Sequence, residues 1–154
     1  SSRRRWIRAG GLTGSSAIAH AASKGMFVIG VDQDEFRTTF VTGQNAEKIL
    51  TSAVKAVDNG VYATVEAIAG NRFESGARTL SAANCGILYA SFNKADAAIP
   101  AEVKTRLEAI WSALAGETLL TGADTTDGTP PAPLAAGALP VLKDGAPKIA
   151  DCRK

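Results

Sequence analysis

One short stretch constrains the fold of this chain most: an apolar run over residues 27–31 that ends abruptly in Asp32, Gln33, Asp34 and Glu35. A run that is bulky on both faces suits a strand covered by helices on each side. The change to polar residues indicates that the strand leaves the core at Asp32. In open parallel sheets, ligands bind just beyond the carboxyl ends of the strands. Asp32 is therefore the first candidate functional residue.

A glycine-rich turn and a short alanine-rich segment precede this strand. Gly10 and Gly11 open the turn, one of the serines that follow is the expected N-cap of a helix over residues 17–23, and Gly25 ends that helix. With the strand over residues 26–31, this order is the second half of a βαβ unit. Backbone N–H groups at such a turn can receive an anion or a sugar hydroxyl. The glycine spacing differs from the dinucleotide-binding fingerprint, so a plain turn is the competing interpretation.

Two amphipathic patterns predict the main helices downstream. Apolar residues recur every three or four positions over residues 46–69 and again over residues 101–115. Residues 36–45 are expected to form a loop, and residues 86–92 contain a predicted strand. Lys55 lies near the start of the first pattern, off its apolar stripe, where it is a candidate to face the same cleft as Asp32. The competing interpretation of Lys55 is a solvated helix lysine.

The character of the chain changes after residue 118. Prolines, glycines and threonines dominate residues 119–154, which we expect to be an extended tail with one short strand near residues 139–142. The predicted organisation is thus a partial α/β ligand-binding region over residues 1–118 and a Pro/Gly-rich tail over residues 119–154.

Charge and composition narrow the function classes. The net charge of +2 is too small to indicate a nucleic-acid partner, and the only basic cluster is the short run at residues 3–5. Cys85 and Cys152 are too far apart for a zinc or redox motif. They either form one disulfide, which requires an oxidising compartment, or remain two thiols. With His20 as the single histidine, we predict no metal, no cofactor and no catalytic residues.

Two motifs at a fixed separation carry a family resemblance: Gly-Val-Asp-Gln-Asp at residues 30–34 and Ile-Leu-Thr-Ser-Ala-Val-Lys at residues 49–55. Together with the glycine turn and the sequence pattern that continues to residue 117, these motifs resemble the basic membrane protein family. These are the PnrA-like, nucleoside-binding lipoproteins that serve ABC importers. The resemblance spans residues 9–117 and corresponds to the C-terminal half of a family member.

The resemblance implies a fold, a function and a site. The fold is α/β, a three-layer sandwich with a mostly parallel sheet, as in part of a type I periplasmic binding protein. The function is recognition of a purine nucleoside for an ABC permease, without chemistry. Asp32 would accept hydrogen bonds from ribose hydroxyls, with Lys55, Gly10, Gly11 and Asp34 beside it. The location would be extracytoplasmic, with membrane anchoring through an N-terminal part that this sequence lacks.

Two alternatives remain open at this stage. One is a Rossmann-like, nucleotide-dependent enzyme half-domain in which the glycine turn holds a phosphate, and Asp32, Asp34 and Glu35 hold Mg²⁺. The other is a truncated remnant that does not bind ligand and needs a partner carrying the missing N-terminal lobe.

Overall fold

A computed structural model describes residues 5–7, 10–119 and 152, and shows an α/β fold built on an open mixed sheet. The four strands lie side by side in sequence order and are β1 (Arg5–Ile7), β2 (Phe27–Asp32), β3 (Ile49–Lys55) and β4 (Ile87–Tyr89). The first three run parallel, and β4 pairs antiparallel with β3. The expectation of an α/β chain with a mostly parallel sheet is therefore confirmed.

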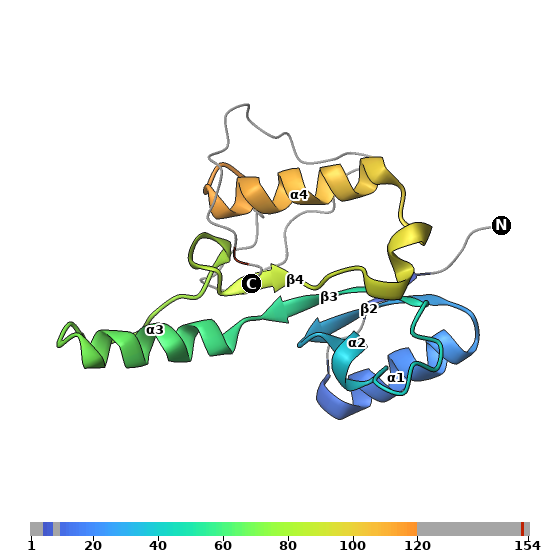
Figure 1. Cartoon of the computed structure of the whole chain (residues 1–154), viewed down its shortest axis with the longest axis horizontal. Helices are drawn as coiled ribbons and strands as arrows, with labels where there is room; N and C mark the ends of the chain where they lie inside the picture. Colours follow the sequence, from blue (N-terminus) through green and yellow to red (C-terminus); the bar gives the residue numbers. More distant parts are fainter. Residues whose placement is uncertain (1–4, 8–9, 120–151, 153–154) are drawn as a thin grey trace, which may run out of the picture.

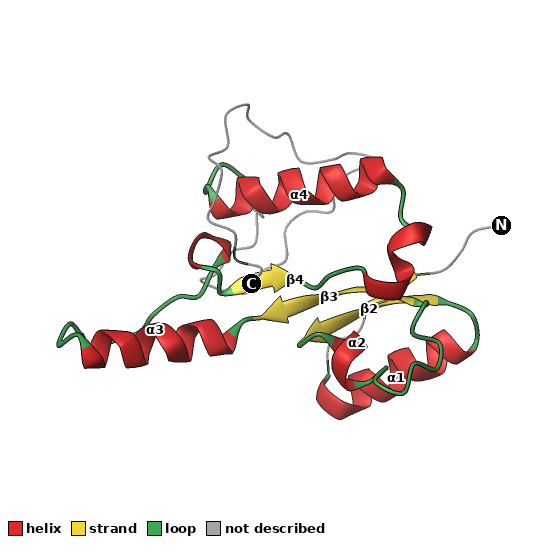
Figure 2. Ribbon diagram, viewed as in Figure 1, coloured by secondary structure: helices red, strands yellow, loops and turns green. Residues whose placement is uncertain are grey.

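Helices flank the sheet on both sides. They are α1 (Gly11–Ser23), α2 (Glu35–Thr38), α3 (Val57–Ala69) and α4 (Ala101–Ala115), with 3₁₀ turns η1 (Ala82–Asn84) and η2 (Asn93–Ala98). Figure 1 shows α1 and α2 below the sheet and α4 above it, while α3 extends away from the end of β3. The same view coloured by element type shows the sheet as a middle layer (Figure 2).

The buried core lies between α1, β2 and the start of β3. Its members are small or branched apolar residues: Ile18, Ala21, Ala22, Val28, Phe40, Ala46 and Ile49, with Met26 and Phe36 packed against them. This core holds α1 and the parallel strands together. It also fixes where their ends meet.

Helix α1 begins earlier than the sequence predicts and ends where predicted. Gly10 takes the N-cap position without any side-chain cap, so the serine cap expected at 15 or 16 is wrong. At the other end Gly25 has φ 79°, and the N–H of Met26 donates to the carbonyl of Ala21 at 3.2 Å. This left-handed glycine with its backward hydrogen bond is a Schellman termination.

The largest correction concerns residues 46–69. They do not form one helix, because residues 49–55 are the central strand β3 and only Val57–Ala69 is helical. Apolar residues four apart also fit the pattern of a strand with every second side chain inward. Pairing with β2 and β4 on either side decides in favour of the strand.

Smaller differences from the sequence-based expectation concern the segments after β2 and after α3. The loop expected from residue 36 begins as the helical turn α2, because the Asp34 side chain accepts a hydrogen bond from the N–H of Phe36 at 3.2 Å and caps it. The strand expected over residues 86–92 is shorter, Ile87–Tyr89, and the helix over residues 101–115 is confirmed. The proposed tail strand at residues 139–142 lies outside the described residues, as does most of the basic run at the start.

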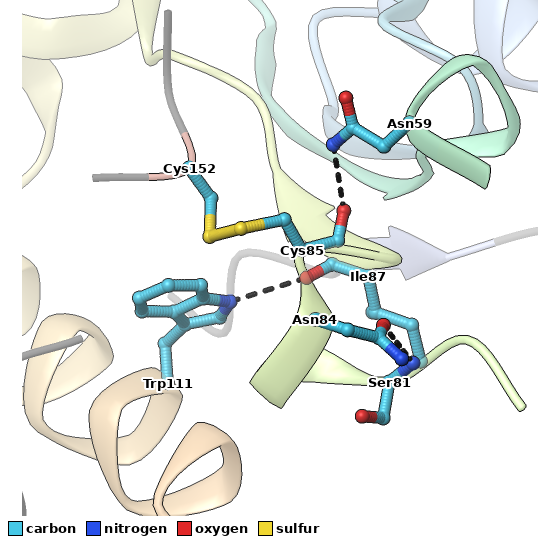
Figure 3. The surroundings of a disulfide bond; sticks show 7 residues. All are labelled: Asn59, Ser81, Asn84, Cys85, Ile87, Trp111 and Cys152. Atoms are coloured by element: carbon cyan, nitrogen blue, oxygen red, sulfur yellow. Dashed lines mark hydrogen bonds between the residues drawn. A yellow bond between two sulfur atoms is a disulfide. The ribbon is translucent and has the colours of Figure 1, made fainter. Parts of the chain in front are cut away.

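The cysteines form a disulfide, which settles the alternative left open by the sequence. Cys85 and Cys152 are bonded across a sequence separation of 67, with their Cα atoms 5.4 Å apart. Figure 3 shows this bond between the turn after η1 and the end of the chain, with Asn59 of α3 donating to the carbonyl of Cys85 at 2.9 Å. Trp111 of α4 donates from Nε1 to the carbonyl of Ile87 at 3.3 Å. The crosslink thus lies where α3, β4 and α4 come together.

Candidate functional site at the carboxyl edge of the sheet

A small pocket of about 230 Å³ lies where β2 ends and α1 begins. It is lined by polar side chains and exposed backbone: Gly10, Gly11, Leu12, Ser15, Val31, Asp32, Gln33 and Glu35. The parallel arrangement of β1 and β2 with α1 between them brings the glycine turn beside the acid run. This is the edge at which open parallel sheets bind ligands.

Asp32 adopts a backbone conformation that few non-glycine residues adopt. Its φ is 75°, in the left-handed region, at the last position of β2. Such strained backbone persists only where the surroundings impose it, and it concentrates at functional sites. The conformation turns the chain out of the sheet immediately after the carboxylate. Asp32 is thereby presented at the rim of the pocket instead of continuing along the strand.

The Asp32 carboxylate is paired with Lys55 of β3. Lys55 Nζ lies 2.7 Å from Asp32 Oδ1, and the two side chains are 70% and 47% exposed. Oδ1 is shielded from solvent, yet it accepts no well-directed hydrogen bond from the described residues. The lysine ammonium therefore pairs with this oxygen by charge at the rim of the pocket. A pair this exposed contributes at most about 1 kcal/mol to folding.

Glu35 forms the floor of the pocket. Its residue is only 4% exposed, and its two carboxylate oxygens accept hydrogen bonds from Ser15 Oγ, at 2.8 Å, and from Thr39 Oγ1. Its backbone N–H donates to Ser52 Oγ of β3 at 3.1 Å. Within the described residues no cation forms an ion pair with it. Hydroxyl donors from α1 and the α2 turn hold this buried carboxylate in place.

Gly30 explains how Glu35 packs so closely on the strand. A Cβ atom at this position would lie 2.5 Å from Glu35 Cγ and would also collide with Ser52 Oγ. Only glycine leaves room for the side chain of Glu35 to lie across β2. The glycine within the motif is thus a packing requirement of the pocket floor.

The glycine turn supplies the other wall. Gly10 has φ 151° and Gly11 has φ 55°, which are conformations that glycine adopts without strain. Because the N-cap carries no side chain, the first N–H groups of α1 have no capping partner of that kind. The positive end of this 13-residue helix therefore faces the pocket beside the two carboxylates.

The structure brings together four of the five residues that the sequence singles out. Gly10, Gly11 and Asp32 line the pocket, and Lys55 reaches it through its ion pair with Asp32. Asp34 points elsewhere, since it caps α2 and lies 3.2 Å from Arg37 Nε. No three acidic, histidine or cysteine side chains converge as metal ligands in the described part of the chain, so the Mg²⁺ arrangement considered above is not formed there.

The sequence does not predict the roles that two residues have in the pocket. The sequence predicts Ser15 or Ser16 as a helix cap, and it gives Glu35 only as a member of the acid run and as a ligand of the alternative Mg²⁺ site. Their contact joins residues 20 positions apart and depends on how α1 packs against the end of β2. The one sequence signal for it is Gly30, the small residue within an otherwise bulky strand.

Comparisons with known proteins bear on the fold. No family model matches the chain, and no curated protein matches it. The chain is similar to the crystal structure of a transcriptional activator of the comK gene from Bacillus halodurans, with a TM-score of 0.60 and 20% sequence identity. The match covers 71% of this chain and 35% of that protein, so the chain spans about a third of its length. At this identity the likeness shows a shared fold.

These comparisons contradict the family expected from the sequence. The similar structure is a transcriptional activator and not an ABC substrate-binding lipoprotein, and no family model supports the basic membrane protein assignment. The expected function in nucleoside import, with a purine nucleoside and an ABC permease as partners, is corrected accordingly. The physical reason is that a glycine turn and an acid at a strand end describe a shape shared by many α/β proteins, whereas ligand identity depends on the whole site.

Proposed function

We propose that this chain is a ligand-sensing lobe of a regulatory protein, which binds a small polar molecule at the carboxyl edge of the sheet without chemistry. The observation that carries the proposal is Asp32, held at φ 75° at the rim of the pocket. The described regulatory role of the similar solved structure supports the regulatory context. A partial type I periplasmic-binding-protein fold, the finer expectation from the sequence, belongs to this proposal because such lobes bind ligands at this edge.

The chemistry of the pocket indicates the class of ligand. Asp32 offers a carboxylate to hydroxyl or ammonium donors, and the N-terminus of α1 favours an acceptor or an anion. The volume of about 230 Å³ suits a compact molecule. We therefore propose a hydroxy acid, an amino acid or a sugar acid, whose donor end meets Asp32 and whose carboxylate meets the turn at Gly10 and Gly11.

The disulfide supports a location for the lobe. Bonds such as Cys85–Cys152 form and persist in oxidising compartments, so the proposal places the lobe outside the cytoplasm. None of the described helices has the length and apolar character to cross a membrane.

The test is a thermal-shift screen of the chain against millimolar amino acids, hydroxy acids and sugar acids, followed by calorimetric titration of any hit. A ligand at a hundredfold excess over its dissociation constant should stabilise the fold by about 2.7 kcal/mol. Asp32→Asn should weaken binding about 10- to 100-fold, because a charged hydrogen bond contributes about 1.5–3 kcal/mol. Lys55→Ala should weaken it less, about 3- to 10-fold, because an exposed pair contributes about 1 kcal/mol or less.

A second aspartate–lysine pair provides the matched control. Lys104 Nζ of α4 also lies 2.7 Å from Asp96 Oδ1 of η2, and neither residue lines the pocket. Asp96→Asn removes the same charge from the same kind of pair and should leave binding unchanged. Equal losses in Asp32→Asn and Asp96→Asn, or no hit in the whole screen, would overturn the proposal.

A further inference from the structure

Helix α3 presents an apolar face that the described part of the chain leaves uncovered. None of its 13 residues is buried. Five large side chains are each more than half exposed: Val57, Val61, Tyr62, Val65 and Ile68. Four of them, at spacings of four, four and three residues, form one stripe along the helix. Phe73, just beyond the helix, is exposed as well.

The contacts on the inward side of α3 show that the apolar face points away from the described part of the molecule. Gly60 lies against Leu80, where an added Cβ would come within 3.0 Å of Leu80 Cδ1, and Asn59 donates to the carbonyl of Cys85. These anchoring positions lie on a different side of the helix from the valines. Figure 1 shows α3 projecting beyond the end of the sheet.

We propose that this face pairs with the α3 face of a second copy of the same chain, with the two helices antiparallel. A two-fold symmetric interface requires a patch that complements itself. A stripe of valines and isoleucine meets that requirement, because the same apolar residues face each other across the axis. The proposal concerns a surface separate from the carboxyl-edge pocket and does not depend on the proposed ligand.

The charges at the two ends of α3 specify the antiparallel direction. Asp58 lies in the first turn, and Arg72 follows the last turn, where its N–H donates to the carbonyl of Ala67 at 2.8 Å. The Arg72 side chain lies back over the helix end, since a Cβ at Gly70 would be 2.9 Å from its Nε. Neither charge forms an ion pair within the described residues. Antiparallel pairing places Asp58 of one copy near Arg72 of the other, whereas parallel pairing places like charges together.

The size of the face sets the expected strength. Stable interfaces bury about 800 Å² on each partner, which is more than one helix of this length and its flanking residue offer. We therefore expect a dimer that forms reversibly at high micromolar concentration.

Sedimentation-velocity measurements of the full chain from about 10 µM to about 1 mM test the proposal. The wild type should shift from monomer to dimer across this range. Val61→Glu combined with Val65→Glu should weaken the dimer at least about 30-fold, since charged side chains would be buried at its centre. Val103→Glu changes a valine of comparable exposure on α4 and should leave the dimer intact. These sites are exposed, so unchanged circular dichroism is expected for every variant.

Charge reversal separates a second copy from any other occupant. Asp58→Arg alone and Arg72→Asp alone should each weaken the dimer about 5-fold or more. Combining both reversals in one chain restores opposite charges at both contacts and should return the dissociation constant to within about 3-fold of the wild type. A wild type that stays monomeric throughout, a glutamate variant that dimerises normally, or a combined reversal that remains weak would each overturn the proposal.

Discussion

Valine is buried in the region around β2 but exposed on helix α3. Val28 of β2 is 0% exposed inside the core, whereas Val61 of α3 is 58% exposed. In the region around β2 the apolar side chains are buried in the core, and the polar side chains at the strand end line the pocket. Helix α3 is tied to the molecule through a glycine, an asparagine and the turn that carries the disulfide. Burial therefore stabilises the region around β2, whereas α3 has no buried residue and is held by a few anchoring contacts beside the crosslink.

The largest expected effect comes from removing the crosslink. Cys85→Ala combined with Cys152→Ala should lower the free energy of unfolding by about 4 kcal/mol, because a bond across 67 residues restricts the unfolded chain strongly. Urea denaturation of the variant and the wild type measures this difference. The α3 and β4 region should show it first, as faster amide hydrogen exchange than in β2. A loss below about 1 kcal/mol would show that this region has other sources of stability.

A matched pair of valine truncations tests the comparison at single residues. Val28→Ala should destabilise the chain by about 2–3 kcal/mol, through lost burial and the cavity that remains. Val61→Ala should change stability by about 0.5 kcal/mol or less, and in the stabilising direction, since alanine is the better helix former. Urea denaturation at a few micromolar keeps the chain monomeric for this test. Similar losses for the two variants would contradict the division of the molecule into these two regions.

Features of the fold that depend on local signals are predictable from the sequence, and those that depend on distant partners are not. The strand at residues 26–31, the helix end at Gly25 and the helix over residues 101–115 follow from local signals, and the structure contains all three within a residue or two. The sequence predicts a helix where strand β3 lies, because the apolar spacing fits both periods and the identity of the segment depends on the strands beside it. Pairing partners distant in sequence are invisible to a local pattern.

The sequence predicts some residues of the site and misses others. Asp32, Gly10 and Gly11 follow from the rule that ligands bind at strand ends beside glycine turns, and the pocket contains them. Lys55 reaches Asp32 from the end of a strand, although the sequence placed it on a helix. The buried contact between Ser15 and Glu35 depends on tertiary packing that no spacing encodes. The motif resemblance predicts the wrong family. These motifs describe the shape of the sheet's carboxyl edge, which many α/β proteins share, and they do not determine which ligand binds there.

The smallest expected effect separates strain from function at Asp32. Asparagine and glycine tolerate φ near 75°, so Asp32→Asn and Asp32→Gly should retain wild-type stability within about 0.5 kcal/mol. Asp32→Ala should lose about 1 kcal/mol, because alanine adopts this conformation at a cost. Thermal melts of the three variants measure the order. All three should lose ligand affinity alike, and an alanine variant as stable as the glycine variant would contradict a strained backbone at this position.

The most direct test of the central claim is a two-dimensional ¹H–¹⁵N NMR titration of the chain with a ligand from the screen. We predict saturable shifts at the N–H groups of Gly11, Leu12, Asp32 and Gln33, with the α3 amides unmoved at the same protein concentration. These shifts should be lost in Asp32→Asn and retained in Asp96→Asn. Shifts confined to α3 or α4, or none at any ligand concentration, would show that the carboxyl edge of the sheet is not the binding site.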